Sequence, residues 1–154
     1  MPSSKINNLY AETGLTSNME DYMESIATLA RQNKVVRVKD IAKNLNIKMP
    51  SVTAALNKLK DLKLIEYEKY GYVELTEKGL ETAENVCRKH ICLSEFFTTV
   101  LSMDFHTADI EACKVEHTLQ PKTCGQIHKF LEFYKEEKKL NREWIKKLET
   151  ILKN

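Results

Sequence analysis

The residues whose chemistry stands out are Cys113, Glu116 and His117, which form a C-x-x-E-H pattern in a stretch of helical character. Residues three and four positions apart share one face of a helix, so the three side chains can point at one spot. Asp109 lies on the same stripe, four residues before Cys113. A thiolate, a carboxylate and an imidazole that converge are typical ligands of a transition metal. A polar stripe on a solvated helix would have the same pattern, so the spacing alone is a weak signal.

The composition indicates a soluble, mainly helical protein. The 154 residues are 42% hydrophobic and 30% charged, with only four Gly and three Pro, which favours helices joined by short connections. No apolar run is long enough to span a membrane, and residues 1–16 lack a signal-peptide core. Cys87, Cys92, Cys113 and Cys124 form no C-x-x-C pair, which is typical of thiols or ligands in a reducing compartment. We therefore expect a cytoplasmic protein.

Positive charge is concentrated in one part of the chain. Between Lys34 and Lys63, eight basic and two acidic residues give a local charge of +6, whereas the whole chain carries +2. Local basic charge of this kind is expected of a DNA-binding face. A solvated lysine-rich surface would give the same count, so the charge needs support from the pattern of elements.

The first helix is predicted over residues 18–32, where apolar residues recur at helical spacing. Ser17 and Glu20 form an S-x-x-E capping box at its start. The β-branched stretch 35–38 then predicts a small strand.

The next elements follow the order of a winged helix-turn-helix. A short helix is predicted over 40–45, a turn over 46–49, and an amphipathic helix from Pro50, where proline suits the first turn. Two short strands, 64–68 and 72–75, would form the wing.

The second half of the chain predicts an all-helical module. Thr76 is a plausible cap for a long helix over 77–101, and a helix over 107–119 carries the ligand-like residues. Two further helices are predicted over 124–138 and 141–152. Several large apolar residues in this module favour a dimer interface. The fold class is therefore mainly α: a polar arm at 1–16, a winged-helix DNA-binding domain at 17–76, and a helical dimerisation and metal-binding domain at 77–154.

The start of the second helix of a helix-turn-helix normally meets bases and phosphates. Ser51 could instead only cap its helix, and Lys58 could only be solvated. The residues predicted to contact DNA are Lys39, Lys48, Pro50, Ser51, Thr53, Ala54, Asn57, Lys58 and Lys69.

Several short sequence motifs, in order and at consistent spacing, match those of one known family. They are MEDYME at 19–24, PSVT at 50–53, YEKY at 67–70, LTEKG at 75–79, RKH at 88–90 and EACKVEH at 111–117. Over nearly all of its length after the polar arm, the chain resembles the diphtheria toxin repressor and manganese transport regulator family. The resemblance implies a metal-dependent repressor, not an enzyme, that binds double-stranded operator DNA as a homodimer. The length resembles the two-domain manganese branch, which lacks an SH3-like third domain.

The resemblance also implies a set of metal ligands, namely Asp21, Glu24, His90, Cys113, Glu116 and His117. Asp21 and Glu24 look like the manganese type, whereas Cys113 looks like the iron type. A second site of the iron branch is matched only in part, by His90 with Ser94 and Asp109 at the next positions.

The types of the predicted ligands do not determine which metal ion binds. Carboxylates favour Mn²⁺, imidazole suits Fe²⁺ and Zn²⁺, and a thiolate favours softer ions. We expect Mn²⁺ or Fe²⁺, with Zn²⁺ as a further alternative.

Other interpretations remain for these residues. The chain could be a winged-helix repressor controlled by a small organic ligand, or a constitutive one, with a purely structural cluster. A catalytic metal centre is a third interpretation, although no spare general base is evident. Cys124 and His128 form a weaker i, i+4 pair, and Cys87 and Cys92 are expected to be small core residues.

Overall fold

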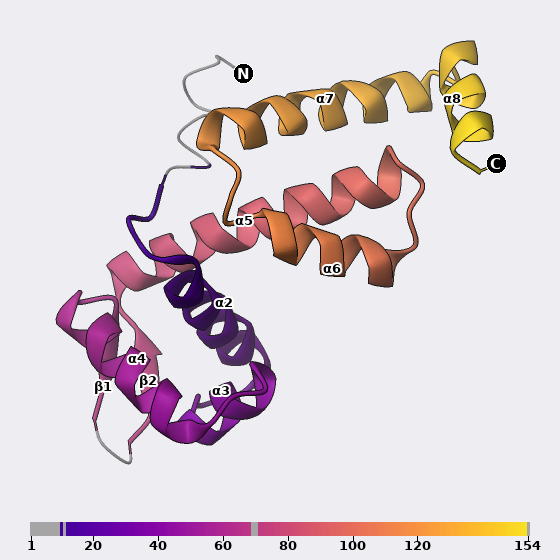
Figure 1. Ribbon diagram of the computed structural model, residues 1–154. Helices are drawn as coiled ribbons and strands as arrows, with labels where there is room; N and C mark the ends of the chain where they lie inside the picture. Colours follow the sequence, from indigo (N-terminus) through magenta and orange to yellow (C-terminus); the bar gives the residue numbers. More distant parts are fainter. Residues whose placement is uncertain (1–9, 11, 69–70, 154) are drawn as a thin grey trace. The chain divides into compact units, whose positions relative to one another are not determined.

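The computed structural model describes residues 10, 12–68 and 71–153. The described elements, in chain order, are α2 (Ser17–Gln32), α3 (Val38–Asn44), α4 (Met49–Asp61), β1 (Ile65–Tyr67), β2 (Val73–Leu75), α5 (Glu77–Thr99), α6 (Phe105–Val115), α7 (Pro121–Lys139) and α8 (Glu143–Lys153) (Figure 1). They confirm the predicted fold class, a mainly helical chain with a helix-turn-helix and hairpin before a helical module.

The chain packs into two compact units. One spans residues 13–87 and the other contains residues 88–153 together with Tyr10 and Glu12. Helix α5 contributes its first half to one unit and its second half to the other. The domain boundaries predicted at residues 16 and 76 stay a prediction.

The cap of α2 lies one residue earlier than predicted. Thr16 is the N-cap, and its side chain accepts a hydrogen bond from the Met19 amide. The carboxylate of Glu20 accepts a hydrogen bond from the Thr13 hydroxyl at 2.5 Å. The predicted capping box of Ser17 and Glu20 is therefore wrong, because Thr16 caps the helix and Glu20 bonds to a residue before it.

The helix-turn-helix is held by apolar side chains from α2, α3 and α4. Ile26, Ile41, Val52, Leu56 and Leu59 are completely buried in one cluster. Burying one such side chain contributes roughly 1.5–3 kcal/mol relative to exposure. The 3.6-residue spacing of the apolar positions therefore determines which face of each helix is left for a partner.

The turn between α3 and α4 uses two local features of the sequence. Asn46 adopts a positive φ of 53°, a conformation that asparagine tolerates better than most residues. Pro50 lies in the first turn of α4, where its missing N–H is not needed.

The wing is a short antiparallel hairpin. Strands β1 and β2 pair Ile65 with Leu75 and Tyr67 with Val73. The strand predicted over residues 35–38 is wrong, because only Val36 pairs, in an isolated bridge to Val73, and Val38 already begins α3.

Thr76 and Gly79 join the hairpin to α5. The Thr76 hydroxyl accepts a hydrogen bond from the Gly79 amide at 3.0 Å and donates to the Lys63 carbonyl at 2.8 Å, which supports its predicted role as a cap. A Cβ atom on Gly79 would lie 1.7 Å from the carbonyl oxygen of Leu64. Only glycine therefore allows this close approach of backbone to helix.

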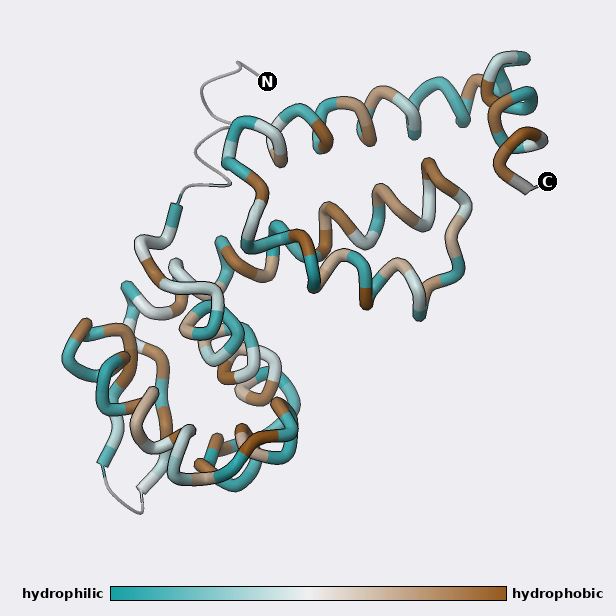
Figure 2. Tube along the Cα trace, in the orientation of Figure 1, coloured by the Kyte–Doolittle hydropathy of each residue, from teal (hydrophilic) through white to brown (hydrophobic). Residues whose placement is uncertain are grey.

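The helical unit contains α6, α7, α8 and the second half of α5. Val100, Leu131, Tyr134 and Ile145 form its larger apolar cluster. Hydrophobic and hydrophilic segments alternate along α7 and α8 (Figure 2), as expected of helices that bury one face. Among the described residues, no helix has the length and apolar character needed to cross a membrane.

Candidate functional site

The candidate site is built around the C-terminal end of α6. At the other end, the Asp104 side chain accepts a hydrogen bond from the Thr107 amide and so caps the helix. Hydrogen bonds from the Thr107 side chain and backbone lower the pKa of Asp104. The helix is thus capped at its start, 9 to 13 residues before Cys113, Glu116 and His117.

Helix α6 ends at Val115, four residues earlier than predicted. The hydroxyl of Thr118 donates to the Val115 carbonyl at 2.8 Å, so a side chain there satisfies an end carbonyl. The backbone of Glu116 keeps helical dihedral angles. Glu116 therefore still lies one turn after Cys113, as the i, i+3 argument requires.

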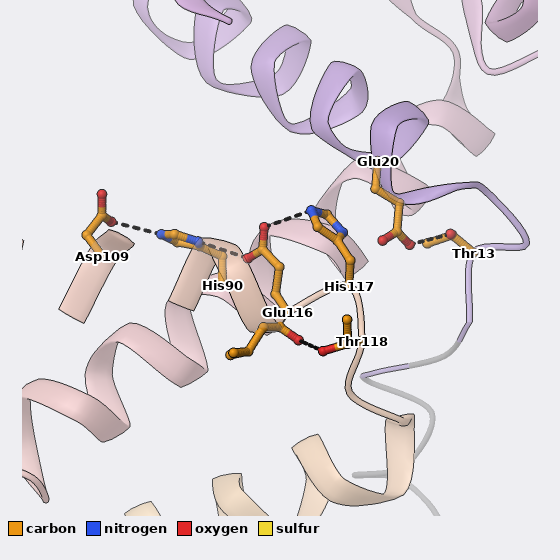
Figure 3. A network of polar contacts seen from close by, with 8 residues as sticks. Thr13, Glu20, His90, Asp109, Glu116, His117 and Thr118 are labelled. Atoms are coloured by element: carbon orange, nitrogen blue, oxygen red, sulfur yellow. Dashed lines mark hydrogen bonds and ion pairs between the residues drawn. The ribbon is translucent and has the colours of Figure 1, made fainter. Parts of the chain in front are cut away.

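Glu116 lies between two imidazole rings (Figure 3). Its side chain is completely buried. Oε2 is 2.9 Å from Nδ1 of His90, and Oε1 is 3.2 Å from Nε2 of His117. A buried carboxyl group with two imidazole nitrogens beside it offers donor atoms of the kinds that metal sites use.

One oxygen of this buried carboxylate lacks a hydrogen bond. Within the described part of the chain, no donor meets hydrogen-bond geometry at Oε1 of Glu116, although the His117 nitrogen is close. An unsatisfied buried acceptor costs roughly 1–3 kcal/mol. A divalent cation would satisfy the oxygen and use the neighbouring imidazole at the same time, so the residues fit a metal.

His90 has a second carboxylate partner that lies further out. Its Nε2 is 2.9 Å from Oδ1 of Asp109, whose side chain is 48% exposed (Figure 3). Metal-bound histidines usually donate their other ring N–H to a carboxylate, which orients the ring. The sequence placed Asp109 only on the ligand stripe and in a partly matched second site. Its contact with His90 joins α5 to α6 across 19 residues of chain.

The structure thus brings together three of the six predicted ligands, His90, Glu116 and His117, within the helical unit. Cys113 is exposed on α6. Asp21 and Glu24 are half-buried, one turn apart on α2, and belong to the other compact unit. The ligand role of all six stays a prediction.

The weaker pair of Cys124 and His128 belongs to a small core. Cys124 packs with Tyr10 and Cys92, and Nδ1 of His128 is 3.1 Å from the Tyr10 hydroxyl. Burial raises the pKa of the Cys92 and Cys124 thiols. A neutral buried thiol is a poor metal ligand. Cys87 and Cys92 are buried among apolar residues, as predicted.

The residues predicted to contact DNA lie mostly on the exposed side of α3 and α4. Thr53 is half-buried and its hydroxyl donates to the Met49 carbonyl at 3.1 Å. Lys69 lies outside the described residues. The exposed ones are Lys39, Lys48, Pro50, Ser51, Ala54, Asn57 and Lys58. Their exposure agrees with a role in DNA binding, which stays a prediction for each residue.

Comparison with known proteins decides the family. The sequence model of the iron dependent repressor N-terminal DNA binding domain matches residues 14–73. That of the iron dependent repressor metal binding and dimerisation domain matches residues 76–145. The chain belongs to the iron-dependent repressor family. This is the family of metal-dependent transcriptional regulators that the sequence resembles, so the resemblance is confirmed, and its members are regulators rather than enzymes.

Relatives of this family member cover most of its length. It is 36% identical over 124 residues, 80% of this chain and 99% of the relative, to an uncharacterized HTH-type transcriptional regulator of Methanocaldococcus jannaschii. It is 30% identical over 125 residues, 80% of this chain and 87% of the relative, to the HTH-type transcriptional regulator MntR of Geobacillus kaustophilus.

Its fold is similar to that of a solved manganese-dependent transcriptional repressor in complex with manganese. The TM-score is 0.69 and the identity 25%, over 75% of this chain. The chain spans about half, 53%, of the length of that solved chain.

Proposed function

We propose that this family member is a repressor that binds operator DNA as a homodimer when loaded with Mn²⁺ or Fe²⁺ and controls metal-uptake genes in the cytoplasm. The observation that carries the proposal is Glu116, a completely buried carboxylate between two imidazoles with one oxygen lacking a hydrogen bond. Such a group is stable mainly when a cation balances its charge.

Six side chains would hold the metal, namely Asp21, Glu24, His90, Cys113, Glu116 and His117. The first two belong to α2 of the DNA-binding unit, and the others belong to the helical unit. A metal that binds ligands from both units stabilises the arrangements in which they meet. If these arrangements also suit the operator, metal and DNA binding favour each other, because coupling between sites is reciprocal.

Manganese is the metal we favour, with Fe²⁺ close behind and Zn²⁺ as a further alternative. Three of the six proposed ligands are carboxylates, which suit Mn²⁺, whereas Cys113 raises the affinity for softer ions. The name of the MntR relative and the manganese complex of the solved repressor support this choice.

A homodimer is supported by apolar side chains that a single chain leaves exposed on the helical unit. Phe105 is 72% exposed and Ile91 57%. Other exposed apolar residues of this unit include Ile110, Phe130, Phe133, Leu140 and Ile151. Exposed apolar surface of this kind is typical of an interface between subunits, and the matching family domain is one of dimerisation.

The experiment is fluorescence anisotropy with labelled DNA from upstream of the protein's own gene. The full chain is titrated with chelator and then with Mn²⁺, anaerobic Fe²⁺ and Zn²⁺ in turn. We expect tight binding only with metal, and the order of the three ions identifies the preferred one. Binding that is indifferent to metal would contradict the proposal and favour a small organic effector or constitutive binding.

Two variants locate the site. Cys113→Ala should abolish metal-dependent DNA binding and leave the fold intact, because Cys113 is exposed. The matched control is Glu111→Gln on the same helix, whose carboxylate pairs with Lys114 at 2.8 Å; it should behave like the parent. A Cys113→Ala protein that responds to metal like the parent would remove Cys113 from the ligand set.

A further inference from the structure

Arg37 is held against the wing of the DNA-binding unit. Its guanidinium lies over the ring of Tyr72, 5.2 Å from the centroid, and its Nη2 donates to the Tyr72 hydroxyl at 3.5 Å. Both side chains are exposed. The contact joins the residue that caps α3 to the residue that precedes β2.

Hydrogen bonds hold the backbone next to Arg37 and Tyr72. The Val73 amide donates to the Val36 carbonyl at 2.9 Å, in the isolated bridge between the neighbours of Arg37 and Tyr72. The Arg37 amide donates to the Asp40 carboxylate at 3.2 Å. The backbone from which the guanidinium extends is therefore held by hydrogen bonds to the hairpin and to α3.

Arg37 also lines a cavity between α3, α4 and the hairpin. The cavity has a volume of about 530 Å³. Its walls come from the start of α3, the start of α4 and the hairpin, and the residues are Arg37, Val38, Lys39, Met49, Pro50, Thr53, Tyr67 and Gly71. Arg37 and Lys39 are the cations among these described residues, and none of the eight is acidic. The lining of this cavity therefore carries a net positive charge.

We propose that Arg37 binds a backbone phosphate of the DNA, and that Tyr72 holds the guanidinium in position for it. A guanidinium that lies over an aromatic ring and donates one N–H to the tyrosine hydroxyl keeps its other N–H groups for phosphate oxygens. A phosphate contact orients the protein on the duplex without reading its sequence. The inference rests on the proposed DNA binding, but it does not depend on the identity of the operator.

The rival interpretation is that Arg37 only fastens the wing to α3. The two roles differ in their salt dependence. Each neutralised phosphate releases condensed counterions and adds roughly 0.9 to the slope of log K against log salt concentration. A purely structural arginine would weaken binding, if at all, without changing this slope.

The test measures anisotropy of a labelled random-sequence duplex with the Mn²⁺-loaded full chain at several salt concentrations. Arg37→Ala should lower the slope by about 1 and weaken binding equally on duplexes of different sequence. Arg37→Lys should keep the slope and bind less tightly, since an ammonium forms no fork with phosphate. Tyr72→Leu should weaken binding, and Tyr72→Phe should weaken it less, because phenylalanine loses the hydroxyl that accepts from Arg37 but keeps the ring beneath the guanidinium. Arg31→Ala, an exposed arginine in the last turn of α2, is the matched control and should keep the parent's slope.

The outcomes separate the inference from the proposed function. A parent protein that binds no duplex even at low salt would overturn both. A parent that binds, with an Arg37→Ala variant of unchanged slope, would overturn only the phosphate contact. A loss confined to duplexes with one particular base pair would show that Arg37 contacts a base instead.

Discussion

Replacing Glu116 by glutamine tests whether this completely buried side chain binds the metal. The variant keeps the shape of the side chain and removes its charge. Without metal, the parent carries a buried carboxylate with one oxygen lacking a hydrogen bond, and a neutral amide costs less to bury than a charge. We therefore expect the metal-free variant to be as stable as the metal-free parent, or more stable.

With metal bound, the parent should be more stable than the Glu116→Gln variant. A ligand present at 100 times its Kd stabilises the folded state by about 2.7 kcal/mol. For a chain of about 150 residues, each kcal/mol shifts Tm by roughly 2–4 °C, so the parent should gain roughly 5–11 °C. If the loss of Glu116 weakens binding 100-fold, the same metal concentration adds only about 0.4 kcal/mol, or roughly 1 °C.

The assay is thermal unfolding followed by tryptophan fluorescence, in chelator and in Mn²⁺. The chain has a single tryptophan, Trp144, which contacts Phe133 and Tyr134 in the helical unit, so the signal reports on the unit that carries Glu116. Glu111→Gln is again the control and should show the full metal-induced shift.

Two results would refute the reasoning. An equal rise in Tm with Mn²⁺ for the Glu116→Gln variant and the parent would exclude Glu116 as a ligand. A metal-free variant that is much less stable, with an unchanged metal-induced shift, would show that Glu116 holds the two histidines for the fold alone.

Three further predictions follow from other parts of the chain. Gly79→Ala should destabilise the DNA-binding unit by roughly 1–3 kcal/mol or more, because the new Cβ would overlap the Leu64 carbonyl; an unchanged urea midpoint would contradict this. Asp109→Ala should weaken metal binding roughly 10–100-fold and Asp109→Asn less, since Asp109 accepts from His90; calorimetry should give an unchanged stoichiometry, and a lower one would make Asp109 a ligand. The free energy of unfolding should fall as pH rises above about 9, because burial raises the pKa of Tyr10, Cys92 and Cys124. The folded chain then retains protons that the unfolded chain loses, and melts at about pH 8 and 10 should show the decline.

Most helices and the order of the elements could be predicted because they depend on neighbours in the sequence. The apolar spacing in α2 and α4, the proline at the start of α4 and the cap at Thr76 are all local features. The errors arise where several local solutions compete. Thr16 and Ser17 are both good caps, and the stretch 35–38 suits a strand but is shortened to a bridge by the start of α3.

The candidate site, like the fold, could be predicted only in part from the sequence. The residue types at His90, Cys113, Glu116 and His117, and the family words around them, were sufficient to indicate a metal-dependent repressor from the sequence, and the family is confirmed. Which atoms meet was not predictable, because α5 and α6 must first pack together. The bonds of His90 to Glu116 and to Asp109 span 26 and 19 residues of chain.

The sequence by itself therefore determined the class of fold, the family and the list of candidate ligands, since these depend on residue types and their spacing along the chain. Only the tertiary structure decided that Glu116 is completely buried with an unsatisfied oxygen, and that the Arg37 guanidinium lies over the ring of a tyrosine 35 residues away. Burial and long-range contacts depend on how the helices and the hairpin pack. Local patterns in the sequence do not specify that packing.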